Sequence, residues 1–391
     1  MMSSDKPDAS VIIVLYNSAA FVRTCLASII ADASAPKEII VVDNASTDVG
    51  RALVEREFPT VRLIALPQNL GFGAACNVGA AAAQGRYLAF VNPDTVVEPG
   101  WLAALIAALD ADPTIGAVSP KLTLWDQPQT INACGLDIHF VGFGSCHFFG
   151  RPASQVRTMG DIGAISGAAF VMSRTLYQRL GGLDPHFFLY VEDTDLSWRL
   201  RLAGYRCCYV PQAVVRHHFP PGFPAQKFFY LERNRYWLLL KNLDGAALLA
   251  LLPGLCVAEA CSWGYALLRG WSYVRAKWSA HRWLVQQWSA LHQARAKAIL
   301  NRHAITMSAL VRSGSVRIAY DVAYPGLLAR WAGVVCDPLY AGCRWFALTA
   351  LSGWERTSGA DARLAPVGVE ALHASPEEPA HAAWSASPSS S

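Results

Sequence analysis

The sequence predicts an α/β fold in which a doubly wound, mostly parallel sheet is followed by a helical extension. Short apolar runs bounded by polar residues alternate with segments of helical period in the first part of the chain. Asn and Asp follow most of these runs, at the strand ends where such sheets bind ligands. Beyond Leu243 the chain becomes apolar and rich in tryptophan, which indicates a second region.

The first region reads as four strands joined by helices. Buried strands are predicted at residues 11–15, 38–42, 61–65 and 87–91, because each is a short apolar run between polar residues. Apolar residues recur with helical period over 21–30, a second helix passes through Leu53, and an Ala-rich helix follows Gly73. Strand and helix alternating at this spacing favour a parallel sheet.

The next part is less regular. Residues 120–160 are rich in Gly and aromatic residues without a clear period, so we expect a long excursion with short strands over the site. Strands are predicted again at 167–172 and 205–210, with a turn at 181–184 between them.

An acidic segment at 187–201 is the strongest candidate for chemistry. An aromatic and apolar lead-in delivers Glu192, Asp193 and Asp195 at the start of a predicted helix. Apolar neighbours raise the pKa of a carboxyl group, which suits a general base. Acids in a first helical turn are also common caps, so both interpretations remain open.

Two further carboxylates, Asp43 and Asp94, close predicted parallel strands and are expected in one crevice. Asp43 is suited to accept a hydrogen bond from a base or a sugar, and Asp94 to hold a divalent cation. The alternatives are an Asx-type turn at 43–46 and a helix cap before Val96. The loop at 69–73 is a weak phosphate signal, and the absence of Gly-Lys-Ser/Thr excludes a P-loop NTPase.

Composition limits the function classes. The 391 residues suffice for one large domain with an appendage, and a net charge of +4 does not suggest nucleic acid. Ten cysteines without metal-ligand spacing are expected to be reduced thiols in a cytosolic setting. Residues 1–10 are polar, are expected to be flexible, and carry no apolar signal core.

The second region is predicted to touch a membrane. Residues 246–268 are long and apolar enough to span one, but Pro253, Gly254 and Glu259 interrupt the run. Tryptophans then alternate with basic residues, which is typical of a helix lying on an anionic lipid surface. Packing of this helix against the protein itself is the alternative. The Ala-, Ser- and Pro-rich residues 357–391 are predicted to be a disordered tail.

Six short motifs in order resemble glycosyltransferase family 2, the inverting enzymes of GT-A fold that use nucleotide-activated sugars. They lie at residues 11–17, 42–48, 69–77, 92–94, 166–170 and 192–199. The Arg-Asn-Arg segment at 233–235 is similar to that of the rhamnosyltransferase-like branch in bacterial surface polysaccharide assembly. The resemblance implies a GT-A domain over 11–243 with a Rossmann-like nucleotide-binding half, then a helical, membrane-associated extension over 244–356.

The resemblance also implies the site residues. Asp193 is expected as the catalytic base, with Mg²⁺ or Mn²⁺ held by Asp94 and His217, or by His218 in place of His217. Asn92 stands at the first position of the family's Asp-x-Asp metal motif, so Asp94 is expected to be the main carboxylate ligand. The expected donor-binding residues are Tyr16, Asn17, Asp43, Asn77, Asn92 and Asp94, and the expected acceptor-binding residues are Glu192, Asp195 and Trp198.

The implied activity is transfer of a single sugar, with rhamnose as the first candidate, from a nucleoside-diphosphate sugar to a lipid-linked or polysaccharide acceptor. Residues 232–237 lack the Gln of the Gln-x-x-Arg-Trp motif of processive synthases. The expected location is the cytoplasmic face of the plasma membrane, as a peripheral protein. A sugar-phosphate nucleotidyltransferase would need a Gly-rich basic loop after residue 15, and a carbohydrate-binding protein with a degenerate site is the other alternative.

Overall fold

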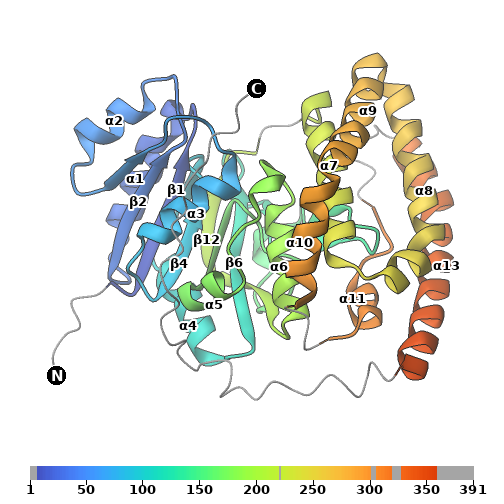
Figure 1. Cartoon of the computed structure of the whole chain (residues 1–391). Helices are drawn as coiled ribbons and strands as arrows, with labels where there is room; N and C mark the ends of the chain where they lie inside the picture. The colour runs from blue at the N-terminus through green and yellow to red at the C-terminus, as the bar shows by residue number, and fades with distance from the viewer. Residues whose placement is uncertain (1–6, 220–221, 301–304, 319–326, 359–391) are drawn as a thin grey trace.

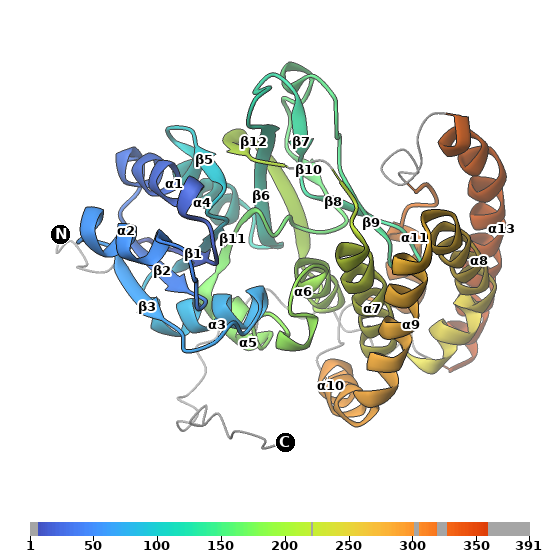
Figure 2. The same cartoon turned by 90° about the horizontal axis from the view of Figure 1, so that it is seen from above.

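The computed structural model describes residues 7–219, 222–300, 305–318 and 327–358. Its centre is one large mixed sheet (Figure 1), in which the strand order is β10-β12-β6-β11-β4-β1-β2-β3. A group of long helices stands beside the sheet, which Figure 2 shows from above. The predicted disordered tail lies outside the described residues except for its first two positions, which end a helix.

The parallel half of the sheet matches the prediction. β1 (Ala9–Leu15) lies between β2 (Lys37–Asp43) and β4 (Tyr87–Val91), and β3 (Arg62–Ala65) pairs with β2. The connections are the helices α1 (Ala19–Ala31), α2 (Gly50–Glu57) and α3 (Phe72–Ala82). Because β1 begins at Ala9, the predicted flexible N-terminus is shorter than residues 1–10.

The other half differs from the prediction. β6 (Ile115–Leu124) is a long strand that the sequence analysis did not identify, and it takes residues 120–124 out of the expected excursion. β12 (Arg206–His217) pairs with β6 in parallel and runs seven residues beyond the predicted end at Val210. β11 (Ala169–Ser173) is antiparallel to both β4 and β6, and β5 (Thr95–Val97) pairs with β12. The pairing of β12 with β6 shifts register between Val210 and Val214, and β12 then continues to His217.

Short elements fill the predicted excursion. These are β7 (Ile131–Ala133), β8 (Leu136–Ile138), β9 (Gly144–Cys146), the 3₁₀ helix η1 (Ala153–Gln155) and β10 (Gly160–Asp161).

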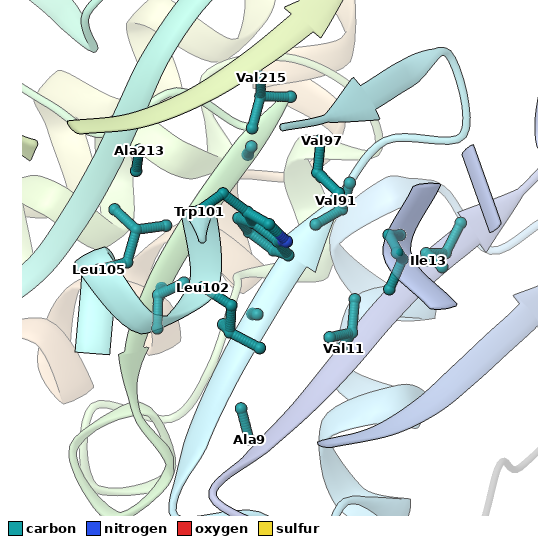
Figure 3. Close-up of a cluster of buried hydrophobic side chains, with 14 of the residues drawn as sticks. Ala9, Val11, Ile13, Val91, Val97, Trp101, Leu102, Leu105, Ala213 and Val215 are labelled. Atoms are coloured by element: carbon teal, nitrogen blue, oxygen red, sulfur yellow. The ribbon is translucent and has the colours of Figure 1, made fainter. Parts of the chain in front are cut away.

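Helices cover both faces of the sheet. On one face, α1, α2 and α4 (Trp101–Ala111) enclose a core in which Trp101 is completely buried beside Val91 and Val97 (Figure 3). On the other face, α3, α5 (Arg174–Arg179) and α6 (Glu192–Leu202) pack on alternate residues of the same strands, such as Ile12 and Phe90. This alternation is the consequence of the two-residue period of a strand buried on both sides.

The helical region packs against α6, one of the helices on the second face of the sheet. It comprises α7 (Ala225–Asn242), α8 (Gly245–Arg269), α9 (Trp271–Gln286), α10 (Trp288–Leu300), α11 (Met307–Ser313) and α13 (Leu327–Ser358). A shared apolar cluster joins Trp198 of α6 to residues of α7, α8, α11 and α13. Pro253 and Gly254, which interrupt the apolar run in the sequence, lie inside one continuous helix, α8. The domain boundary near residue 243 stays a prediction.

Candidate active site

The carboxyl ends of β1 and β2 form the first part of the site. Tyr16 is half exposed there, and Asn17 accepts hydrogen bonds from the backbone and hydroxyl of Thr47 at 2.8 and 3.2 Å. Asp43 is buried, and its Oδ1 accepts from the backbone N–H of Ser46 at 3.1 Å. The alternative Asx-type turn therefore exists, and Asp43 stands at the strand end where a ligand would bind.

The side chain of Asn77, expected to bind the donor, is engaged in hydrogen bonds within the protein. Its amide accepts from the Leu183 N–H at 3.0 Å and from the Tyr177 hydroxyl, and it donates to the Leu183 carbonyl at 2.7 Å. Both ends of the side chain are thus used to hold the turn before α6. A residue that the sequence analysis did not single out, Asn44, instead faces the loop after β3. It bonds to Asn69, Leu70 and Gly71.

Asp94 and His217 lie close to each other although they come from different strands. Asp94 follows β4, His217 ends β12, and the Nε2 of His217 lies 3.7 Å from the Oδ1 of Asp94. The Oδ1 atoms of Asn92 and Asp94 are buried and have no hydrogen-bond partner among the described residues. These two oxygens, with the His217 nitrogen beside Asp94, are a donor set that suits a small divalent cation.

The hydrogen-bond partner of Nδ1 indicates which ring nitrogen of His217 carries the proton. Nδ1 lies 2.8 Å from Oδ1 of Asn132, an acceptor, so the proton belongs on Nδ1 and the lone pair of Nε2 faces Asp94. Burial lowers the pKa of His217, while the charge of Asp94 opposes that shift. The ring of His218 packs instead on Phe21 and Trp125. Within the described residues no three His, Cys, Asp or Glu side chains gather as a metal site, so the protein offers few ligands.

Asp193 lies in the first turn of α6, close to the second half of this edge. Its Oδ2 accepts from the Gly167 N–H at 2.8 Å, and its Oδ1 accepts from the Thr194 N–H at 2.6 Å. The neighbouring Ala168 carbonyl accepts from the Asn92 N–H at 2.9 Å, which links Asp193 to the Asp94 side of the site. Burial raises the pKa of Asp193 against these hydrogen bonds. The carboxylate is therefore both oriented and made more basic.

Glu192 is the more strongly perturbed acid. Its side chain is buried, its Oε2 has no hydrogen-bond partner among the described residues, and burial with the charge of Asp193 raises its pKa to about 8. Of the two coupled acids, Glu192 has the more strongly raised pKa, so burial favours its protonated form near neutral pH.

Asp195 and Trp198 are buried inside the protein, which does not suit the acceptor-binding role expected of them. Asp195 is completely buried, and its carboxylate binds Arg199, Lys241 and Asn242. Trp198 is buried in the apolar cluster between α6 and the helical region. Both residues follow the inward face of α6, so they secure the helix rather than line the site.

The backbone before Asp193 is strained, and α7 holds it. Phe188, Tyr190 and Val191 adopt φ of 60°, 68° and 72°, a region that costs roughly 1–3 kcal/mol for such residues. The Asn234 amide donates to the carbonyls of Phe187, Leu189 and Tyr190 at 3.0, 2.8 and 2.7 Å. In the sequence, Arg233 and Asn234 stand out only through the family resemblance, because their partners lie more than forty residues away along the chain.

The raised pKa of Glu192 predicts a pH-dependent stability difference. The folded state keeps the proton up to about pH 8, whereas an ordinary glutamate releases it near 4.5, so wild-type stability falls as pH rises through this window. Glu192→Gln cannot ionise, and its melting temperature relative to wild type should rise between about pH 5 and pH 8.5. Thermal melts of both proteins across that range measure the effect. Glu55→Gln, at an exposed carboxylate, is the control with a constant difference; a constant difference for Glu192→Gln would contradict the assignment.

Comparison with known proteins agrees with this geometry. Residues 10–180 match the model of glycosyl transferase family 2. N-acetylglucosaminyl-diphospho-decaprenol L-rhamnosyltransferase of Mycobacterium tuberculosis is 29% identical over 230 residues, which cover 53% of this chain and 75% of that protein. The O-antigen biosynthesis protein RfbC of Myxococcus xanthus is 28% identical over 244 residues, covering 59% of this chain but 19% of that protein.

A solved structure shares the fold. GalNAc-T7, crystallised with UDP, GalNAc and Mn²⁺, superposes with a TM-score of 0.52 at 18% identity, covering 64% of this chain and 51% of that one. The chain thus spans about half the length of this neighbour. The family match and the polysaccharide-synthesis relatives lead to one conclusion. Residues 10–180 form a glycosyl transferase family 2 domain that is similar in sequence to a rhamnosyltransferase, and the chain is a glycosyltransferase.

Proposed function

We propose that the protein transfers a single sugar, with inversion, from a nucleoside-diphosphate sugar to a hydroxyl of a lipid-linked or polysaccharide acceptor in cell-envelope glycan synthesis. The observation that carries this proposal is the meeting of a basic carboxylate, Asp193, with the Asp94–His217 pair at one edge of the sheet. The M. tuberculosis relative acts, by its name, on a diphospho-decaprenol acceptor, and rhamnose is therefore the first sugar to test.

Asp193 is the proposed general base. Its carboxylate takes the proton of the acceptor hydroxyl while that oxygen attacks the anomeric carbon on the side opposite the leaving diphosphate, which inverts the configuration. The two backbone N–H groups that bind its oxygens fix the carboxylate, and the pKa raised by burial strengthens it as a base. Glu192, holding its own proton, limits the negative charge beside the reacting oxygen.

A divalent cation, Mg²⁺ or Mn²⁺, is part of the proposal, and Asp94 and His217 would hold it. When bound, such an ion neutralises the charge that develops on a diphosphate leaving group. The buried Oδ1 atoms of Asn92 and Asp94 and the free Nε2 of His217 support this assignment. Tyr16, Asn17 and Asp43 are proposed to contact the nucleotide, because they lie at the adjoining strand ends.

The helical region is proposed to rest on the cytoplasmic surface of the plasma membrane. In the described residues one helix, α8, is long and apolar enough to span a bilayer, which is weak support for crossing it. Trp271 and Trp278 are 71% and 63% exposed, and Arg275 between them is exposed too. Lys277 differs from the predicted lipid-facing cations, since it is completely buried and pairs with Glu232 and Glu259.

Replacing Asp193 tests the base. Asp193→Asn keeps the shape but removes the acceptor of the proton, so turnover should fall by roughly 10²–10⁴-fold while the Kd of the nucleotide stays near that of wild type. Mass spectrometry of reactions with several nucleotide sugars and a polyprenyl-diphosphate acceptor gives the rate, and calorimetry gives the Kd. Asp110→Asn, at the amino end of the sheet beside Arg86, should remain active. Turnover of Asp193→Asn above about a tenth of wild type would refute the role.

The metal assignment is tested by three variants. Asp94→Ala should weaken nucleotide binding and remove its dependence on Mn²⁺, His217→Ala should reduce that dependence less, and His218→Ala should leave it unchanged. The reason is that Asp94 and His217 face each other, whereas His218 packs on Phe21. Calorimetry with and without Mn²⁺ measures each. A larger effect of His218→Ala would show that the other histidine is the ligand.

Membrane attachment is tested with liposomes. Each exposed Lys or Arg near an anionic surface adds about 1 kcal/mol of attraction, so binding should rise with anionic lipid content, and high salt or alkaline carbonate should release part of the protein. Trp271→Ser and Trp278→Ser should weaken binding, whereas Val49→Ser, at an equally exposed position just before α2, should not. Full resistance to carbonate, with a periplasmic location of a reporter fused after Ser391, would show instead that α8 crosses the bilayer.

A further inference from the structure

A lysine in the first turn of α7, Lys227, lies beside the site without a role in the mechanism above. Its ammonium nitrogen lies 5.6 Å from the ring centroid of Tyr190, 5.6 Å from that of Phe219 and 6.0 Å from that of Phe223. Tyr190 belongs to the strained segment before Glu192, and Phe219 follows the histidine pair at the end of β12. The three rings therefore hold the ammonium between the two halves of the site.

Two neighbours of Lys227, Phe219 and Cys146, relate its ammonium to the reacting groups. The ring of Phe219 lies 6.1 Å from that of His217, which adjoins Asp94. The thiol of Cys146 lies within electrostatic range of both the Lys227 ammonium and the Asp193 carboxylate. Lys227 thus borders the space between the proposed base and the proposed cation site.

The ammonium has no anion of its own. Among the described residues, no carboxylate lies within ion-pair distance of Lys227, and its Nζ donates no hydrogen bond there. By contrast, the two buried lysines of this helical region, Lys241 and Lys277, each bind two carboxylates. Burial lowers the pKa of Lys227, because the charged ammonium loses solvation at this position.

Aromatic faces compensate only part of that cost. A cation over an aromatic ring gains only a modest attraction at a partly exposed position, and the ring faces leave the three N–H groups of the ammonium unused. A phosphate oxygen would use those N–H groups and supply the missing charge. The aromatic rings also fix the lysine before a ligand arrives, so less side-chain entropy is lost on binding.

We infer that Lys227 is a binding residue for a phosphate or diphosphate group of a substrate, held ready by Tyr190, Phe219 and Phe223. This inference rests on the proposed function, which supplies two sources of the same chemistry. One is the diphosphate of the nucleotide donor, and the other is the diphosphate that links a sugar to a lipid acceptor.

The test compares Lys227→Met, which keeps the length and apolar stem but removes the charge, with Lys227→Arg, which keeps the charge. Gln226→Met, the same replacement at the exposed neighbouring position of α7, is the matched control. Calorimetry with the full chain and Mn²⁺ uses UDP and dTDP as donor probes and farnesyl diphosphate as the lipid probe. Lys227→Met should weaken binding by about 10- to 100-fold, the loss expected for charged hydrogen bonds, whereas Lys227→Arg and Gln226→Met should stay within about threefold of wild type.

The probes separate the two sources. Weaker binding of UDP and dTDP assigns Lys227 to the donor diphosphate, and weaker binding of farnesyl diphosphate alone assigns it to the acceptor. The melting temperature of Lys227→Met should equal or exceed that of wild type, because an unpaired, partly buried charge is removed. Wild-type binding of the probes together with unchanged affinities in Lys227→Met would overturn this inference alone. A wild-type protein that binds none of the probes would overturn the proposed function as well.

Discussion

The contact on which the site depends is that between Asn234 of α7 and the three carbonyls of Phe187, Leu189 and Tyr190. These carbonyls belong to a segment in which Phe188, Tyr190 and Val191 adopt positive φ, a conformation that is unusual for the β-branched Val191. The segment leads directly into α6, so its shape sets the place of Asp193. Without a fixed partner for its carbonyls, the strained backbone would relax and move the carboxylate.

The same helix secures the segment on either side of this contact. Trp237 and Lys241 bind Asp184 before the strained residues, and Lys241 binds Asp195 after them. These buried groups are paired and hydrogen-bonded, which is the condition for tolerating charge in the interior. One face of α7 therefore fixes both ends of the turn that presents the proposed base.

The opposite face of α7 carries a second charge network. Glu232 and Arg235 join Glu259 of α8 and Lys277 of α9, so two acids are balanced by two bases. Glu259 interrupts an apolar run in the sequence, but within the protein its charge is neutralised by Arg235 and Lys277. The helices proposed to rest on lipid are thus connected through α7 to the segment that carries Asp193.

The sequence by itself determined the alternation of strand and helix, the polar residues at the strand ends and the acidic start of α6. These features follow from local periodicity and from residue types, which neighbours along the chain already display. Asp43, Asp94 and Asp193 could be found in this way because a strand end or a first helical turn fixes their position. The motifs also sufficed for the family, since they recur in a set order.

Tertiary structure decided which polar side chains are free. Asn77 and Asp195 looked available, but their partners, such as Leu183 and Lys241, lie far away in the chain. His217 differs from His218 only because successive strand residues point to opposite sides and β12 extends to that position. Lys277 and Lys227 look alike in the sequence, yet packing gives one two carboxylates and the other only aromatic rings. The partners of a buried charge are set by which helices meet, and a local pattern does not contain that information.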